Sequence, residues 1–265
     1  MDRLRAPVHR WDFWQWTFGG RCGSLSLRYN ERQGRRPVEL HDVGNLLDPT
    51  PLAIETGYER FGDGVLHVAV RTDLRGCTGE MFEWWFRFRP DTQQYIWWHP
   101  VDHEFSEWSE YVDGTHVGSV HHAREAFTGL PAQDVTIQFR DPIEFFDQSA
   151  YEEARGNGSI SSAVCACVGP GLNAAKGEDG RVLGGRLLHV ARDTSLGCAL
   201  RSHFFLGQDM PAMGFSPEAL TDIFSDEFGR ALLMHCYNEF TFLSRFLPSL
   251  FIAENRATQS VAVPW

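Results

Sequence analysis

The chain has 265 residues, of which 43% are hydrophobic and 13% are aromatic. This length and composition predict a folded globular protein with a sizeable core and exclude a disordered chain. The formal net charge of −11 argues against a nucleic acid partner, because the phosphate backbone would be repelled.

The sequence shows neither a membrane span nor a secretion signal. No apolar run reaches the ~18 residues that a span needs, and residues 1–18 lack the apolar segment and cleavage site of a signal peptide. We therefore expect a cytoplasmic protein without a membrane partner, and six cysteines fit that reducing compartment. Cys165 and Cys167 form a CxC pair, but no second pair with zinc-finger spacing exists, so we interpret them as small buried side chains.

Residues 1–50 carry several Trp, Gly and Pro residues without a regular pattern. This predicts an N-terminal arm or small subdomain, which could also supply the contact of a homodimer. Residues 51–265 are expected to form one domain, since neither an internal repeat nor a low-complexity linker divides them.

From residue 52 onward the pattern indicates β-strands. Gly62-Asp63-Gly64 is a hairpin signal between strands expected at 52–60 and 65–72. A short helix is expected from Asp141 through Ala154, followed by a glycine-rich loop near 170–185. Further strands are expected at 81–89, 94–99, 115–127, 134–139, 186–191 and 196–206.

The last part of the chain changes to a helical period. Ser216 is a favourable N-cap, and Pro217 suits the first helical position. Apolar residues then recur every three or four positions, which predicts one long helix ending near Pro248. Many antiparallel strands followed by such a helix predict an α+β fold, in which a curved sheet grips the helix and a cavity lies between them.

The clearest chemical signal on this helix is His235 with Glu239. Residues four apart lie on one helix face, so the imidazole and the carboxylate can bind the same ion. The same face carries apolar residues, and a buried carboxylate without a partner is costly. A metal would relieve that cost, while the alternative is a neutral His–Glu pair held by hydrogen bonds in the core.

Two other histidine segments stand among aromatic residues. The segment 95–106 contains His99, Asp102 and His103, which are plausible metal ligands or their hydrogen-bond partners. The alternative is an aromatic core strand with surface histidines. His189 lies between apolar residues, and such a histidine is more often a core residue than a catalytic one.

Glu125 is the third candidate carboxylate. It shares one face of its predicted strand with His121 and Phe127, which would direct it inward. The rival interpretation is a surface salt bridge with Arg124 or Arg140. Spacing alone leaves open whether these groups converge in one cavity.

An ordered set of segments resembles the diacetylphloroglucinol and phloretin hydrolase family, and together they cover about residues 51–248. The segments are GEMFEWWF (79–86), YIWWHPVDH (95–103), FRDP (139–142), LHVARDT (188–194), RSHFFLG (201–207) and HCYNEF (235–240). The resemblance implies a helix-grip, START-like fold around a zinc ion held by two His and two Glu residues.

Carried onto this chain, the resemblance implies His103, His235 and Glu239 as metal ligands. It implies Glu125 as the fourth ligand, with Glu144 as the reserve candidate. It also implies four substrate-contacting positions, Tyr95, His189, Ser106 and Phe204. Of these, Tyr95 and His189 would be catalytic. Ser106 and Phe204 depart from the family's residue types, which puts an identical substrate in doubt.

The family cleaves the carbon–carbon bond between an acyl group and a polyhydroxylated aromatic ring. The hydroxyls allow the ring to tautomerise to a keto form that is protonated at the acyl-bearing carbon, which permits retro-Claisen cleavage by water. Zinc would lower the pKa of water and polarise the carbonyl. Tyr95 and His189 would hold the ring hydroxyls and move the proton. Two carboxylate ligands leave another divalent metal, such as iron or manganese, as an alternative.

Two other classes of function stay open from the sequence. One is a cyclase, isomerase or lyase that acts on an aromatic polyketide in the same pocket without consuming water, because function does not follow from fold. The other is a binding protein for a hydrophobic small molecule, in which His235 and Glu239 are only paired with each other. Metal content and water consumption distinguish the three.

Overall fold

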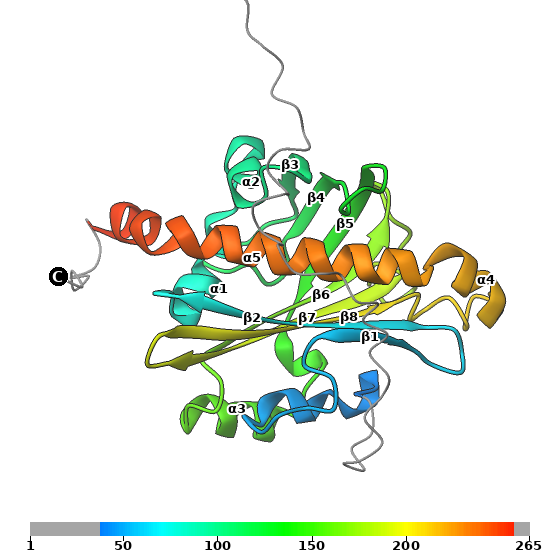
Figure 1. The fold of residues 1–265 in the computed structure, drawn as a ribbon, viewed down its shortest axis with the longest axis horizontal. Helices are drawn as coiled ribbons and strands as arrows, with labels where there is room; N and C mark the ends of the chain where they lie inside the picture. Colours follow the sequence, from blue (N-terminus) through cyan, green and yellow to red (C-terminus); the bar gives the residue numbers. More distant parts are fainter. Residues whose placement is uncertain (1–37, 257–265) are drawn as a thin grey trace, which may run out of the picture. The chain divides into compact units, whose positions relative to one another are not determined.

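An eight-stranded antiparallel sheet dominates the computed structural model, which describes residues 38–256 (Figure 1). Its strands follow the order β1-β2-β8-β7-β6-β5-β4-β3, so β2, the second strand in the sequence, pairs with β8, the last. The bounds are Gly57–Arg60 (β1), Leu66–Arg75 (β2), His103–Ser109 (β3), Val120–Glu125 (β4), Gln133–Arg140 (β5), Ser162–Pro170 (β6), Gly185–Thr194 (β7) and Gly197–Leu206 (β8).

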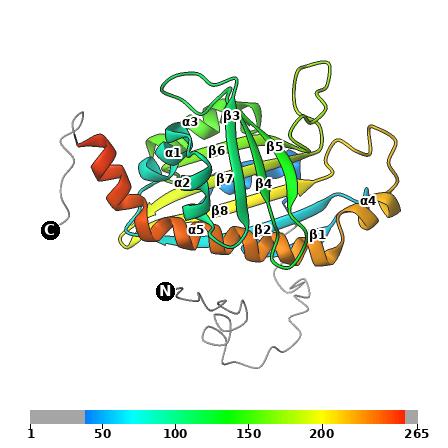
Figure 2. The same cartoon turned by 90° about the horizontal axis from the view of Figure 1, so that it is seen from above.

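Helices lie on both faces of the sheet (Figures 1 and 2). The long helix α5 crosses one face and packs there with α1 and α2, while η3 and α3 lie on the other. The bounds are Leu40–Leu47 (η3), Gly79–Phe88 (α1), Thr92–Trp98 (α2), Pro142–Glu144 (η4), Gln148–Gly156 (α3), Pro217–Ile223 (α4) and Asp226–Asn255 (α5). This arrangement confirms the predicted α+β class, a curved sheet gripping a C-terminal helix.

Alternation along the strands produces one core on each side of the sheet. Leu66, Val68 and Val70 of β2 belong to the core that contains α5, where Phe240 is fully buried. Phe205 of β8 belongs to the second core, beneath η3 and α3. The cavity described below lies in the first core, so α5 and the sheet together position its side chains.

The strands predicted at 81–89 and 94–99 are wrong, because both segments are helices. The hydroxyl of Thr78 accepts from the backbone N–H of Met81 at the start of α1. Asp91 and Gln94 form a reciprocal capping box at the start of α2. The aromatic residues suggested strands by β-propensity, but these caps and the packing of the aromatic faces against α5 outweigh that preference.

Two strands of the sheet were missed. β3 begins at His103, in a segment predicted to end in a turn, and β6 occupies the region expected to be mixed. The helix expected from Asp141 through Ala154 is two pieces, η4 and α3, the second capped by Asp147. The loop near 170–185 is confirmed, although it includes the bridge between Lys176 and Val182.

The C-terminal helix differs from the prediction at both ends. Ser216 caps α4 as expected, but a second cap, Ser225, starts α5 after a break at Phe224. At the other end, α5 continues through Pro248 to Asn255. Proline lacks the N–H that would bond to the carbonyl of Ser244, and that carbonyl instead faces the thiol of Cys77 at 3.9 Å. This contact and the burial of Phe251 help the helix to continue.

The expectations for the cysteines and the N-terminal region can be compared with the structure only where it describes those residues. Cys77, Cys165, Cys167, Cys198 and Cys236 are free and buried, as expected. Cys22 and most of the predicted N-terminal arm lie outside the described residues, and the domain division at residue 50 stays a prediction. Within 38–256, no helix is both long and apolar enough to span a membrane.

Candidate metal centre and cavity

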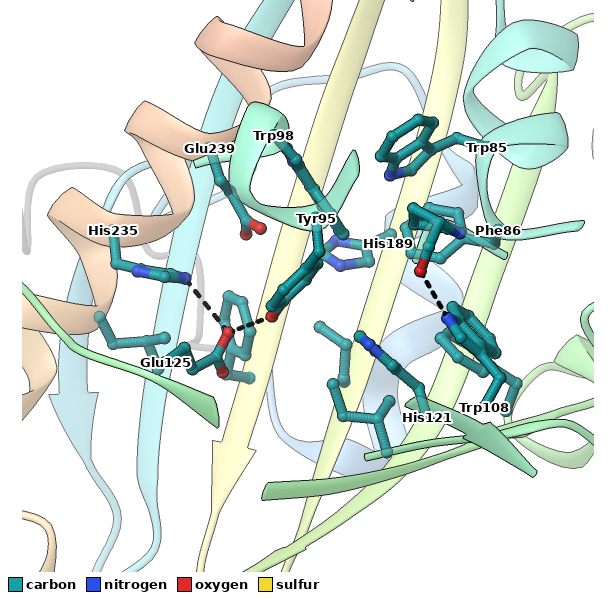
Figure 3. Close-up of a pocket in the computed structure, with 16 residues that line it drawn as sticks. Trp85, Phe86, Tyr95, Trp98, Trp108, His121, Glu125, His189, His235 and Glu239 are labelled. Carbon is teal, nitrogen blue, oxygen red and sulfur yellow. Dashed lines mark hydrogen bonds and ion pairs between the residues drawn. The ribbon is translucent and has the colours of Figure 1, made fainter. Parts of the chain in front are cut away.

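A cavity lies between the sheet and α5, and aromatic side chains form much of its wall (Figure 3). They come from α1, α2, β3, β5 and β8 and are Trp85, Phe86, Tyr95, Trp98, Trp108, Phe139 and Phe204. The titratable side chains on the wall, besides Tyr95, are His121, Glu125, His189, His235 and Glu239. Flat apolar walls with a few polar groups suit a planar organic ligand.

The four residues predicted as metal ligands lie together, and three of them, Glu125, His235 and Glu239, line this cavity. His103 begins β3 and Glu125 ends β4, and the two are paired across the strands. His235 and Glu239 lie one turn apart on α5. Nε2 of His103 lies 3.6 Å from Oε2 of Glu125 and 3.8 Å from Oε2 of Glu239. Nε2 of His235 lies 3.6 Å from the same Glu125 oxygen.

Hydrogen bonds behind the two imidazoles turn their Nε2 atoms toward the site. Nδ1 of His103 lies 2.9 Å from the backbone oxygen of Tyr95, so Nδ1 carries the proton and Nε2 the lone pair. Nδ1 of His235 lies 3.2 Å from Oδ2 of Asp102, which sets the same tautomer in the neutral ring. The hydroxyl of Tyr95 donates to Oε2 of Glu125 at 2.7 Å and fixes that carboxylate. Such supporting bonds are typical of metal ligands.

Burial makes the charges of this group costly. It raises the pKa of Glu239 to about 8, and the nearby charge of Glu125 adds to the shift. It lowers the pKa of His103 well below its ordinary value, and the charge of His235 adds to that shift. Burial also opposes the charge of His235, but the carboxylates of Asp102 and Glu125 outweigh it and raise its pKa to about 10.

The donor set fits a divalent metal ion. Ligand atoms of His103, Glu125 and His235 lie within 4.8 Å of one another, and Glu239 faces His103 beside them. Nε2 of His103 is buried without a hydrogen-bond partner among the described residues. Two imidazoles and two carboxylates are ligands that zinc and similar metals accept. A cation would compensate the buried carboxylates and would use the free His103 lone pair.

His99 and Asp102 lie behind the four predicted ligands, and the sequence left open whether they are ligands or hydrogen-bond partners. The backbone N–H of Asp102 donates to Nδ1 of His99, which leaves the proton on Nε2, 3.5 Å from Oδ2 of Asp102. His99 also stacks on His235 with ring centroids 4.9 Å apart. Although His99, Asp102 and His235 could geometrically hold an ion, a His99 ring in this tautomer has no lone pair for one. Asp102 therefore serves as the hydrogen-bond acceptor for His235.

Three predicted substrate-contacting residues line the cavity. Tyr95 lies on α2, where burial and the Glu125 carboxylate raise its pKa well above the ordinary value. His189 lies on β7 with Nδ1 2.8 Å from the hydroxyl of Ser202, and burial lowers its pKa to about 3. Phe204 of β8 contributes an apolar edge.

The other two candidates lie elsewhere. Ser106 is buried behind His121 and, among the described residues, is not part of the cavity wall. Its hydroxyl bonds to Pro90 and His121, so the structure does not bring it together with the other candidates on the wall. Glu144, the reserve ligand, lies on η4 and pairs with Arg140 at 2.9 Å and Arg181 at 3.2 Å. Glu144 is therefore paired with arginines and is not grouped with the four residues of the centre.

The model of the DAPG hydrolase PhiG domain matches residues 38–252. The chain belongs to the DAPG hydrolase family. The match includes all four predicted ligands, Tyr95 and His189. Family membership therefore covers the sheet, α5 and the whole centre described above.

Individual relatives of this DAPG hydrolase family member are distant. A 2,4-diacetylphloroglucinol hydrolase from a Pseudomonas species is 25% identical over 234 residues, which cover 80% of this chain and 76% of that protein. A phloretin hydrolase from Eubacterium ramulus is 27% identical over 212 residues, 75% of this chain and 72% of that protein. Among solved structures, protein Ms6760 from Mycobacterium smegmatis aligns with a TM-score of 0.38 at 9% identity, covering 78% of this chain and 99% of that one.

Proposed function

We propose that this protein is a metal-dependent hydrolase that cleaves the carbon–carbon bond between an acyl group and a polyhydroxylated aromatic ring. The reaction consumes one water: the acyl group leaves as a carboxylic acid, and the ring carbon receives a proton. The substrate class is the acylphloroglucinol type of aromatic ketone. The family membership and the activities for which the two hydrolase relatives are named support this proposal.

One observation carries the proposal: the buried cluster of two imidazoles and two carboxylates opens onto an aromatic cavity. The cluster supplies ligands for an ion, and the cavity supplies walls for a flat ring. A planar ketone in this cavity can direct its carbonyl toward the cluster while its ring lies among Trp85, Trp98 and Trp108. A binding protein would need the cavity but not the cluster.

His103, Glu125, His235 and Glu239 would hold the metal, which we propose to be zinc. When bound, it would polarise the acyl carbonyl and lower the pKa of water toward about 7. Tyr95 would keep Glu125 oriented through their 2.7 Å hydrogen bond. Because burial and Glu125 raise its pKa well above the ordinary value, Tyr95 stays protonated at neutral pH. Its hydroxyl oxygen can also accept a hydrogen bond from a ring hydroxyl.

His189 would move the proton that reaches the ring carbon. Ser202 holds its Nδ1, which leaves Nε2 as the ring nitrogen available to a ligand in the cavity. Burial lowers its pKa to about 3, so the imidazole is neutral before the reaction. A neutral imidazole can accept a hydrogen bond from a ring hydroxyl and pass that proton on to the ring carbon.

The experiment is to incubate the metal-loaded full chain with 2,4-diacetylphloroglucinol in water enriched in oxygen-18. The proposal predicts acetate carrying the heavy oxygen and a ring product lacking one acetyl group. His235→Ala should release no acetate, whereas Tyr237→Ala, an exposed position on the same helix, should behave as the wild type. Ring rearrangement without acetate would support a cyclase or isomerase and overturn the proposed hydrolase.

A further inference from the structure

His121 lines the cavity with its ring held rigidly in place. The residue is buried on β4, and it faces the same side of the strand as Glu125. Trp108 stacks on one side, with ring centroids 4.4 Å apart and the planes inclined by 13°. Tyr95 meets the ring edge-on, with centroids 5.1 Å apart. Figure 3 shows His121 and Trp108 on the other side of Tyr95 from His235 and Glu239.

The tautomer of His121 follows from its hydrogen bonds. The hydroxyl of Ser106 lies 2.8 Å from the carbonyl oxygen of Pro90 and 2.9 Å from Nε2 of His121. A hydroxyl has one hydrogen, and the carbonyl can only accept. The hydroxyl of Ser106 therefore donates to Pro90, so it must accept from a protonated Nε2 of His121. Burial lowers the pKa of His121 to about 3, so the ring carries a single proton at neutral pH.

Nδ1 of His121 consequently keeps its lone pair. No residue in the described part of the chain donates a hydrogen bond to this nitrogen. This nitrogen is not among the fully buried polar atoms that lack a partner, and a donor supplied by a ligand would add a hydrogen bond there. The ring belongs to the cavity wall, so the missing donor can come from a molecule in the cavity.

We infer that His121 is a substrate-binding residue whose Nδ1 accepts a hydrogen bond from a phenolic hydroxyl on the side of the ring away from the acyl group. The inference rests on the proposed function, which places the acyl group at the metal ligands. Phe204 offers no polar contact, and the hydroxyl of Ser106 is occupied by Pro90 and His121. His121 therefore supplies a polar contact that neither of these two residues makes.

This contact predicts a specific selectivity. A substrate with a free hydroxyl para to its acyl group supplies the donor, whereas the para O-methyl ether supplies none and adds bulk. The wild type should discriminate between them by KM, because the contact is present in the bound substrate before the bond breaks. We expect a preference of about tenfold, the typical size of one such hydrogen bond in a buried site.

The test compares KM and kcat for monoacetylphloroglucinol and its para O-methyl ether, or, where they are not cleaved, their inhibition constants against hydrolysis of 2,4-diacetylphloroglucinol, with metal content measured on each protein. His121→Phe should raise KM for the phenol about tenfold and leave KM for the ether nearly unchanged, with full metal content. The matched control is His122→Phe. His122 is the next residue on β4, faces the other side, and bonds Ser109 at 2.7 Å in a similar His–Ser pair.

A second pair of variants covers the case in which His121→Phe does not fold. His121→Asn places an amide oxygen near the Nδ1 position and should keep part of the preference for the phenol. His121→Gln reaches toward Ser106 but leaves the Nδ1 position empty, and it should lose the preference. The reverse order of these two variants would overturn the inference.

Two further outcomes separate the inference from the proposed function. Wild type that hydrolyses the phenol, with His121→Phe keeping the same preference for it over the ether, overturns the role of His121 alone. An equal increase in KM for the phenol and the ether in His121→Phe also overturns it, because the ring would then act only by packing. Wild type that releases no acetate from 2,4-diacetylphloroglucinol overturns the proposed function, and the inference with it.

Discussion

Oδ2 of Asp102 lies 3.2 Å from Nδ1 of His235, although the two residues are far apart in the chain. Both are buried, and the contact joins the turn before β3 to the middle of α5. With a metal bound, a carboxylate in this position would hold the neutral imidazole with its Nε2 lone pair directed at the cluster. Asp102 would then act on the metal through His235 and not as a ligand.

Asp102→Ala should therefore weaken metal binding by about 10–100-fold, the usual cost of losing such a partner. Asp102→Asn keeps an oxygen that can accept from Nδ1, so it should lose less. Competition with a chromophoric chelator measures the affinity. Asp134→Ala, which breaks an exposed ion pair with Arg124, is the control. Equal affinity in Asp102→Ala and wild type would show that His235 needs no support.

Metal removal should lower the thermal stability of the wild type. An ion that binds only the folded chain stabilises it by about 2.7 kcal/mol at a hundredfold excess over its dissociation constant, or roughly 5–10 °C in Tm for a chain of this size. Glu239→Gln removes one carboxylate of the cluster and should make Tm nearly independent of a chelator. Calorimetric scans with and without chelator test this, and a wild-type Tm that ignores the chelator would contradict it.

His189→Ala should lower kcat by about 10²–10⁴-fold, the usual contribution of a positioned proton-transfer group, and leave metal content intact. His189 is not among the four ligands, so its loss should not release the ion. Metal analysis and acetate release on the same sample separate the two effects. Turnover at the wild-type level would remove His189 from the mechanism.

The ion pair of Glu55 and Arg201 should give a pH-dependent contribution to stability. Their closest atoms are 2.7 Å apart. Burial raises the pKa of Glu55, but hydrogen bonds from Arg201 and the Leu52 backbone outweigh burial and lower it overall. A carboxyl with a lowered folded pKa stabilises the protein above its unfolded pKa of about 4.3, and the gain is lost as pH falls through the folded value.

Glu55→Gln should accordingly reduce the free energy of unfolding by roughly 1–3 kcal/mol at pH 7. The difference from wild type should shrink as the pH is lowered below about 4, where the native carboxylate becomes protonated. Urea unfolding at several pH values measures it. Glu152→Gln is a comparison on an exposed position of α3, and a pH-independent difference for Glu55→Gln would argue against the ion pair as its cause.

The sequence predicted the α+β class, the long C-terminal helix and the strands near β2, β7 and β8, because alternation and caps are local signals. It failed at α1 and α2, where a dense run of aromatic residues imitates a strand. Packing against α5 decides their structure, and no short segment carries that information. β6 was missed because its small residues between Ser162 and Pro170 give no alternation, since both faces of the strand are buried.

The site was predictable where spacing or resemblance applied. His235 and Glu239 follow from helical periodicity, and the placement of His103 and Glu125 rested on the family resemblance. Their meeting depends on the pairing of β3 with β4, which is a tertiary property. Asp102 and His121 were harder to identify from the sequence, because the roles proposed for them arise from hydrogen bonds that join segments distant in sequence. For Asp102, the available signal was its position next to His103 in the sequence. For His121, it was the strand face that it shares with Glu125.

Elemental analysis by plasma mass spectrometry of the full chain, wild type and His235→Ala purified side by side, measures directly whether these residues bind a metal. We expect about one zinc ion per chain in the wild type and its loss in the variant, with Tyr237→Ala retaining the ion. Wild type that releases acetate from 2,4-diacetylphloroglucinol while carrying no divalent metal, or equal metal in His235→Ala, would contradict it.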